Sequence, residues 1–433
     1  MDEVAEVREQ EHEDMANLSE GFKMTELGPL PEDWRVVAFS EAVLNERFGV
    51  GKVRQQEYQK AGRFPIVDQG QKLIAGYWDR LEDVYQGPLP VIIFGDHTRV
   101  FKFVDFPFVC GADGTKILVP DISKFFPAFL YFALTRLEIP NRGYNRHFSL
   151  LREQRLPCPP LSEQRAIAHV LRTVQRAKEA TERVIQATRE LKKSLMRYLF
   201  TYGPVPIDEA EKVPLKETEI GLVPEHWDVV KLGDVAKTAS GGTPSRKNPE
   251  YFGGKIHWVK SGELNDSLVS CTEETLTEMG IINSNARVFP KGTLLIAMYG
   301  ATAGKVGILE CEAASNQAVC AVFPQKILSS NFLFYVFMYR RSKLFSERYG
   351  GAQPNISQTV IKAFNIPLPP LHEQHEIVRI LQAVDKKLQA EEARKQALEA
   401  LFKALLNNLM TGKIRVKDVV LPNVGEGKGD VTH

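Results

Sequence analysis

The sequence predicts an α+β protein with two similar mixed α/β domains, separated by two long antiparallel coiled-coil helices and related by an internal pseudo-two-fold repeat. The first observation behind this prediction is a motif that occurs twice: Leu-Pro-Cys-Pro-Pro-Leu-Ser-Glu-Gln at 156–164 and Ile-Pro-Leu-Pro-Pro-Leu-His-Glu-Gln at 366–374. The second is an upstream pair, Thr-Glu-Leu-Gly-Pro-Leu-Pro-Glu-Asp-Trp at 25–34 and Thr-Glu-Ile-Gly-Leu-Val-Pro-Glu-His-Trp at 218–227. The chain therefore has the order domain, helix, domain, helix, and we expect it to present two similar sites.

These repeats set the expected boundaries. The first segment is an acidic tail with too few apolar side chains to fold alone, so we expect it to be disordered or loosely helical. The predicted segments are the N-terminal tail 1–24, the first domain 25–160, a central long helix 161–205, a linker 206–217, the second domain 218–370, a distal long helix 371–412 and a C-terminal tail 413–433.

Each copy of the Pro-Pro-Leu motif opens a run without glycine or proline, which is typical of a long helix, and Gly203 and Gly412 follow the last apolar turns as stop signals. Apolar or small residues recur at steps of three and four, a heptad seam. The seam positions are 167, 171, 174, 177, 181, 184, 188, 191, 195 and 198 in the first helix, and 377, 381, 384, 388, 398, 402, 405 and 409 in the second, where Glu391 and Lys395 interrupt it. The pattern predicts that the helices, each ~60 Å long at 1.5 Å per residue, pair with each other.

The helix ends are more apolar than a two-helix seam requires. The surplus predicts that further helices, from a partner, dock there to make a bundle. The residues concerned are Leu195, Met196, Leu199, Phe200, Leu405, Leu406, Leu409 and Met410.

Both domains show the same order of short β-type runs followed by an apolar helix. The runs are 90–94, 100–104 and 117–119 with a helix at 125–137 in the first domain, and 294–298, 306–309 and 318–323 with a helix at 332–345 in the second.

Composition is that of an ordinary globular protein, with 43% hydrophobic and 25% charged residues and a net charge of +1. A balanced total neither indicates nor excludes nucleic acid, because binding needs only a local basic face. The chain has no run of eighteen apolar residues and no apolar secretory segment, so we expect no membrane association and a cytoplasmic location. The 5 cysteines lack Cys-x-x-Cys spacing and are expected to be reduced thiols.

The search for catalytic motifs finds only near misses. Residues 300–305 are one short of a phosphate loop and Val306 replaces its Ser/Thr, so a tight turn between strands is the better interpretation. His-Glu-Gln-His at 372–375 is one residue short of a zinc motif and lacks a third ligand. The two Pro-Pro pairs are followed by Leu, and neither matches the (Asn/Asp)-Pro-Pro-(Tyr/Phe) loop of DNA amino-methyltransferases. We therefore expect a chain that catalyses nothing, binds no metal and holds no cofactor.

Loops rich in cations and planar amides are the candidate DNA contacts, because phosphates need cations and base edges need planar donors and acceptors. In the first domain the candidates are Gln69, Gln71, Lys72, His97, Thr98, Arg99, Arg142, Tyr144, Asn145, Arg146 and His147. In the second they are Thr243, Ser245, Arg246, Lys247, Lys260, Ser261, Thr302, Lys305, Asn316, Gln317, Arg348, Tyr349, Gln353 and Asn355. For any one residue a surface role or a loop hydrogen bond is the commoner explanation, and roughly a third are expected to touch DNA. The pair Gly241-Gly242 would allow a close phosphate or simply turn the chain.

The ordered motifs resemble those of the specificity (S) subunit of type I restriction–modification systems. The resemblance covers residues 25–412 and rests on the Pro-Pro-Leu-x-Glu-Gln and Leu-x-Pro-Glu-x-Trp repeats, with Ser-Gly-Gly-Thr-Pro at 240–244, the 299–305 segment and Gly-Ala-Gln-Pro-Asn-Ile-Ser at 351–357. In the first domain, Phe-Gly-Asp-His-Thr-Arg at 94–99 and Gly-Ala-Asp-Gly at 111–114 also resemble family segments.

The resemblance implies two target-recognition domains, each reading one half of a split site in double-stranded DNA, and helices that space them. It also implies partners: two methyltransferase (M) subunits docked on the helices, and restriction/translocase (R) subunits through the complex. S-adenosylmethionine, ATP and Mg would be held by those partners. The alternatives are a coiled-coil interaction scaffold with no DNA role, and a self-contained DNA methyltransferase, which the missing catalytic loop opposes.

Overall fold

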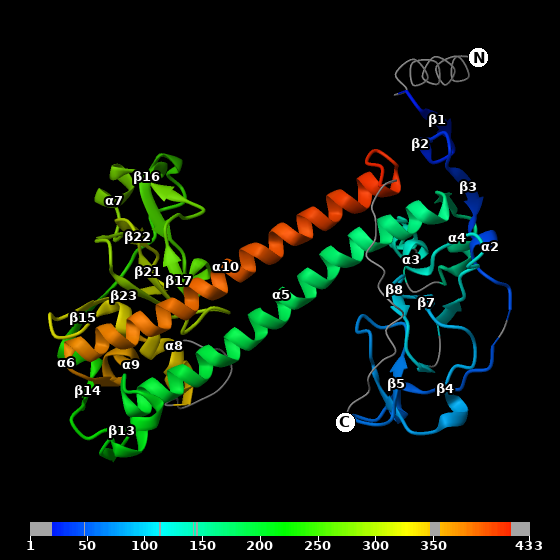
Figure 1. Cartoon of the computed structure of the whole chain (residues 1–433). Coiled ribbons are helices and arrows are strands. Elements are labelled where there is room, and N and C mark those ends of the chain that lie inside the picture. Colours follow the sequence, from blue (N-terminus) through cyan, green and yellow to red (C-terminus); the bar gives the residue numbers. More distant parts are fainter. Residues whose placement is uncertain are drawn as a thin grey trace. The chain divides into compact units, whose positions relative to one another are not determined.

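The computed structural model describes residues 20–46, 48–111, 114–141, 143, 146–346 and 356–416. The chain divides into two compact units. Unit 1 comprises Met1–Thr181 with Arg394–His433, and unit 2 comprises Glu182–Ala393. The two long helices, α5 (Leu161–Tyr202) and α10 (Leu371–Met410), are coloured green and orange in Figure 1, and each contributes one half to each unit.

Both helices follow the sequence prediction. Each ends at its glycine, and Gly203 and Gly412 have φ values of 81° and 67°, which glycine adopts without strain. Within unit 2 the two helices run antiparallel. Arg189 of α5 pairs with Glu392 of α10 at 2.7 Å, and Lys192, which follows Arg189 in α5, pairs at 2.5 Å with Asp385, which precedes Glu392 in α10.

The predicted seam is correct along α10, where even Glu391 lies buried in line with its apolar neighbours. Along α5 it is correct as far as Thr181. Beyond Thr181, Val184 and Leu191 are 40% and 52% exposed while Ile185 and Met196 are buried, and the predicted Leu195 and Tyr198 are partly buried against the core. A straight helix of 3.6 residues per turn drifts from a strict heptad, which accounts for the one-residue shift.

The prediction that the apolar helix ends dock a partner is wrong for the five of these residues that are buried, and for the three that are partly buried it stays a prediction. Met196, Leu199 and Phe200 are buried in the core of unit 2, and Leu195 packs against that core. In unit 1, Leu409 and Met410 are buried in the core, with Leu405 and Leu406 packed against it. Most of the apolar surplus is therefore used inside the chain, where each helix end packs into the core of its unit.

Unit 1 contains the following elements besides its helix halves: β1 (Phe22–Thr25), β2 (Gly28–Pro31), β3 (Arg35–Ala38), α2 (Phe39–Ala42), β4 (Lys52–Val53), β5 (Phe64–Val67), β6 (Gly76–Trp78), β7 (Val91–Gly95), β8 (Phe101–Val104), β9 (Val109–Gly111), β10 (Thr115–Leu118), α3 (Pro127–Thr135), α4 (Phe148–Arg152) and β11 (Arg155–Cys158). Its main sheets have the strand orders β10-β7-β8 and β4-β9-β5-β6.

Unit 2 contains β12 (Leu215–Thr218), β13 (Gly221–Pro224), β14 (Asp228–Lys231), α6 (Leu232–Val235), β15 (Ala236–Ser240), β16 (Phe252–Val259), β17 (Ser267–Val269), β18 (Thr275–Leu276), α7 (Glu278–Ile282), β19 (Val288–Phe289), β20 (Leu294–Ala297), β21 (Val306–Leu309), β22 (Ala313–Ser315), β23 (Val319–Pro324), α8 (Ser330–Ser346), α9 (Gln358–Ala363) and β24 (Asn365–Leu368). Its main sheets have the orders β15-β23-β20-β21-β17 and β18-β16-β22-β19. Every strand and helix predicted from the sequence is present within a few residues of its expected bounds.

A central strand in each unit buries both faces. Along β20, Leu294 and Ile296 face the core shared with α8 and the long helices, while Leu295 and Ala297 face the second sheet. Along β7, Ile92 and Phe94 face the core with α3, and Val91 and Ile93 face the opposite cluster. The period-two alternation of a strand places the sheet between two apolar layers in both units.

The duplicated motifs are joints between each domain and its helix. The carboxylate of Glu163 accepts a 3.0 Å hydrogen bond from the indole N–H of Trp34, and the carboxylate of Glu373 accepts a 2.8 Å bond from Trp227. Both indoles are fully buried, and a buried indole N–H needs such an acceptor.

The following glutamine repeats the same logic. The side chain of Gln164 accepts from the backbone N–H of Phe126 at 2.7 Å and donates to the carbonyls of Lys124 and Pro159 at 2.9 Å each. Gln374 makes the equivalent three bonds, to Ser329, Ile327 and Pro369. Each glutamine has no exposed surface and fixes the segment that leads into α3 or α8. In both copies the motif therefore supplies hydrogen-bond partners to backbone groups at a buried joint.

Candidate nucleic-acid interface

In unit 2 several of the described candidate residues lie at one edge of a sheet. Strands β16 and β22 are neighbours and parallel, with Val259 opposite Ser315. Parallel strands end at the same edge, so Lys260-Ser261 and Asn316-Gln317 emerge side by side. We call this the unit 2 edge.

The loop after β15 joins this edge. The N–H of Gly242 donates to the carbonyl of Ser315 at 2.8 Å, and the hydroxyl of Thr243 donates to the side chain of Gln317. A Cβ atom at Gly241 would lie 2.0 Å from the Ser315 carbonyl, and one at Gly242 would lie 2.3 Å from backbone of Asn285. The glycine pair is therefore required for close packing of the chain on itself.

The hairpin between β20 and β21 completes the edge. It is a tight turn, as predicted, because Gly300 and Gly304 have positive φ and the N–H of Gly304 donates to Ala297 at 2.8 Å. From this turn the hydroxyl of Thr302 donates to the carbonyl of Ser261 at 2.7 Å. Lys305 extends its ammonium to the side chain of Asn265, at 3.0 Å.

Unit 1 repeats this arrangement. Strands β5 and β9 are parallel neighbours, with Val67 opposite Cys110, so the segment beginning at Asp68 emerges at the same edge as the end of β9. The hydroxyl of Thr98, from the β7–β8 hairpin, donates to the carbonyl of Gln69 at 2.5 Å. This bond is the counterpart of Thr302 to Ser261, and we call the region the unit 1 edge.

Other predicted residues of unit 1 have structural roles. Arg99 has a φ of 62° and donates from Nη1 to the carbonyl of Ile139 at 2.9 Å, which ties its guanidinium to the chain. His147 is corrected: it has no exposed surface, and its backbone N–H donates to the buried carboxylate of Asp96 at 2.8 Å. This carboxylate also accepts from Phe148 at 2.8 Å, so it satisfies the first amides of α4 and holds the buried His147 in place.

Exposed candidates remain at both edges. In unit 1 these are Gln71, Lys72 and Arg146, and in unit 2 they are Thr243, Ser245, Arg246, Lys247 and Gln317. Seven further predicted residues lie outside the described residues: Arg142, Tyr144, Asn145, Arg348, Tyr349, Gln353 and Asn355.

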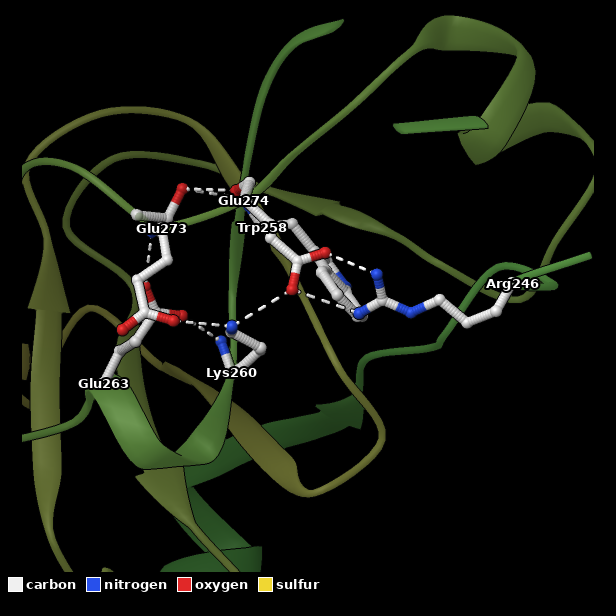
Figure 2. A network of polar contacts seen from close by, with 7 residues as sticks. Arg246, Trp258, Lys260, Glu263, Glu273 and Glu274 are labelled. Carbon is white, nitrogen blue, oxygen red and sulfur yellow. Dashed lines mark hydrogen bonds and ion pairs between the residues drawn. The ribbon is translucent and has the colours of Figure 1, made fainter. Parts of the chain in front are cut away.

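Figure 2 shows the polar network that organises the unit 2 edge. The guanidinium of Arg246 donates through Nη1 and Nη2 to the two oxygens of Glu274, at 2.6 and 3.1 Å. The ammonium of Lys260 donates to Glu273 at 2.7 Å and to Glu274 at 3.1 Å. The hydrogen bonds from Arg246 and then Lys260 lower the pKa of Glu274 to about 2, so it is a carboxylate at neutral pH.

In unit 1 the residue after the corresponding strand carries a negative charge in place of the positive charge in unit 2. Asp68 follows β5 where Lys260 follows β16, and its carboxylate faces the ammonium of Lys102 at 3.4 Å. Lys102 is buried and also donates to the backbone carbonyl of Asp68 at 2.7 Å. Burial lowers the pKa of Lys102, and the charge of Asp68 opposes that shift. At the unit 1 edge, the lysine that pairs with the strand-end residue is therefore buried.

Sequence reasoning missed the acidic partners of Arg246 and Lys260 in this network. Glu274 and Arg246 are distant in sequence, and no local pattern announces their pairing.

Comparison with known proteins identifies the class. Residues 224–400 match the family described as type I restriction modification DNA specificity domain. The chain is 26% identical over 345 residues to the specificity subunit of the type I restriction enzyme EcoR124I/EcoR124II of Escherichia coli, covering 77% of this chain and 82% of that protein. It is 26% identical over 433 residues to the putative MjaX specificity subunit of Methanocaldococcus jannaschii, covering 92% and 97% of the two chains.

The fold agrees. A crystal structure of a type I restriction–modification S subunit from M. genitalium superposes with a TM-score of 0.60 at 17% identity, over 87% of this chain and 96% of that one. The second half of the chain thus matches this DNA specificity domain, and most of the chain is similar in sequence to type I restriction enzyme specificity subunits. Among the described residues, no helix combines the length and hydropathy that crossing a bilayer requires.

Proposed function

We propose that this chain is the DNA sequence-recognition subunit of a type I restriction–modification complex, and that each unit reads one half of a bipartite site in double-stranded DNA. The observation that carries the proposal is the duplicated edge. In both units two parallel strands deliver polar loops to one place, held by the bonds of Thr98 and Thr302 to a neighbouring loop carbonyl. A rigid frame with changeable exposed side chains is what direct readout of bases needs.

The long helices take the spacing role in this proposal. Each is uninterrupted and shared by both units, so the length of α5 and α10 would set the spacer between half-sites. Modification subunits, two per chain, would dock on the outward helix surfaces, where Val184, Leu191 and Leu401 are exposed apolar side chains. Those subunits and the restriction subunits would hold S-adenosylmethionine, ATP and Mg, and the complex would act in the cytoplasm.

Selection from a randomised duplex pool tests this function. The full chain, in complex with its modification subunit, should enrich a bipartite sequence with two specified parts and an unspecified spacer of fixed length. A matched pool bound by the modification subunit alone should show no such enrichment. An unenriched pool with the complex would favour a coiled-coil scaffold without DNA recognition.

A further inference from the structure

Arg246 is an exposed arginine held in one orientation. Its side chain is 57% exposed, in the loop between β15 and β16. Its guanidinium lies 4.4 Å from the ring centroid of Phe252 and 5.3 Å from that of Trp258. The two bonds to Glu274 fix its remaining rotation, as Figure 2 shows. This restraint on both a face and an edge reduces the entropy lost on binding.

The guanidinium retains a second binding edge. It is planar and carries five N–H donors, and parallel pairs lie on the Nη1/Nη2 edge and on the Nε/Nη2 edge. Glu274 occupies the first pair. Within the described part of the chain, Nε of Arg246 has no protein acceptor, so the second pair is presented to an outside partner with two adjacent acceptors. Guanine O6 and N7, or two phosphate oxygens, have that geometry.

The surrounding charges favour the base over the phosphate. The network contains two cations, Arg246 and Lys260, and three carboxylates, Glu263, Glu273 and Glu274. A phosphate at the Nε/Nη2 edge would be placed beside this acidic surplus, and Glu273 is 73% exposed. A guanine edge offers the same two acceptors without a formal charge, so the carboxylates do not oppose it.

We propose that Arg246 is a specificity-determining residue of unit 2 that reads one guanine through its Nε/Nη2 edge, and that Glu274 is the positioning residue that aims it. This inference rests on the proposed function and names the chemistry of its second half-site. The same reading predicts that Glu274 touches no DNA and acts only through Arg246.

The test measures competition binding by the full chain in its complex, on duplexes that differ from the selected site by one base pair. Arg246→Ala should reduce discrimination at one guanine of the second half-site by roughly ten- to a hundredfold and leave every other position specified. Glu274→Gln, which keeps the side-chain shape, should reduce discrimination at that same position. Arg379→Ala is the matched control, because Arg379 forms an even more exposed bidentate pair with Glu376 on α10 and should leave every position unchanged.

Other outcomes overturn the proposal. If Arg246→Ala weakens all duplexes equally and lowers the salt slope by about one unit, Arg246 contacts a phosphate. In that case Glu274→Gln, which removes a negative charge, would strengthen binding to every duplex. Unchanged discrimination in both variants would leave the network a structural ion pair. Retained recognition of the first half-site confirms that a variant is folded, and absence of any sequence preference in the wild-type complex would contradict the proposed function itself.

Discussion

The two edges share a frame and differ in the charges mounted on it. Thr98 and Thr302 donate to equivalent loop carbonyls, and the adjacent strands have equivalent parallel pairing. At the first residue beyond the strand, unit 1 has Asp68 paired with an inward lysine, and unit 2 has Lys260 paired with outward carboxylates. A duplicated backbone with divergent side chains at the strand ends can present one geometry to two different sequences.

Substitutions at the buried joints should have the largest effect on stability, and they test whether the two units are built alike. Gln164→Ala and Gln374→Ala should each destabilise their own unit by about 4 kcal/mol, because each deletion leaves three backbone groups unsatisfied in a buried place. Thermal unfolding followed by calorimetry measures the loss. Two costs of similar size are expected, and a unit that tolerates its substitution would show that the joints are not equivalent.

Replacing the lysine at each edge should have different effects on stability. Lys102→Met should cost about 3 kcal/mol, because it removes the cation of a largely buried pair and leaves Asp68 with an uncompensated charge. Lys260→Met should cost less than about 1 kcal/mol, because its partners lie at the surface. Denaturant unfolding of the two variants side by side tests the contrast, and equal costs would contradict the inward and outward assignments.

The threonine bonds should matter equally in both units. Thr98→Val and Thr302→Val each remove one side-chain to backbone bond and should cost about 1 kcal/mol. Hydrogen exchange at the two hairpins reports the local opening. A large effect in one hairpin with none in the other would mean that the frame is not shared.

The smallest expected effect is a change in the stability of unit 2 at acidic pH. The hydrogen bonds from Arg246 and Lys260 lower the pKa of Glu274 from its ordinary value of 4.5 to about 2, so its ion pairs stabilise unit 2 above pH 4.5 and lose that contribution progressively as the pH falls toward 2. The stability difference between wild type and Glu274→Gln should be constant from pH 8 to about pH 5 and shrink below it. A difference that changes between pH 6 and 8 would place the titration elsewhere.

The positions of the helices and strands could be predicted from the sequence, but the contacts between residues distant in sequence could not. Helix bounds follow from the absence of glycine and proline between Leu161 and Gly203, and strand positions follow from short apolar runs such as that at β20. Predicting that Ile185 is buried in place of Val184 would have required the actual pitch of the helix.

The candidate site was predicted as a set of loops and not as a network. Lys260, Ser261, Asn316 and Gln317 were identified from residue type, and the structure brings them together because β16 and β22 are parallel. His147 was misplaced, because a cationic loop gives no sign that one of its members is buried. The acceptors of Arg246 come from a distant loop, and only the folded chain reveals them.

Methylome sequencing of two edge variants tests the central claim that each unit reads its own half-site. The full complex would carry Gln69→Ala with Gln71→Ala in one strain, and Ser261→Ala with Gln317→Ala in another. The account predicts that the first pair alters only one half of the methylated motif and the second pair only the other half, with the spacer unchanged. Alteration of both halves by either pair, or of neither half by both pairs, would contradict it.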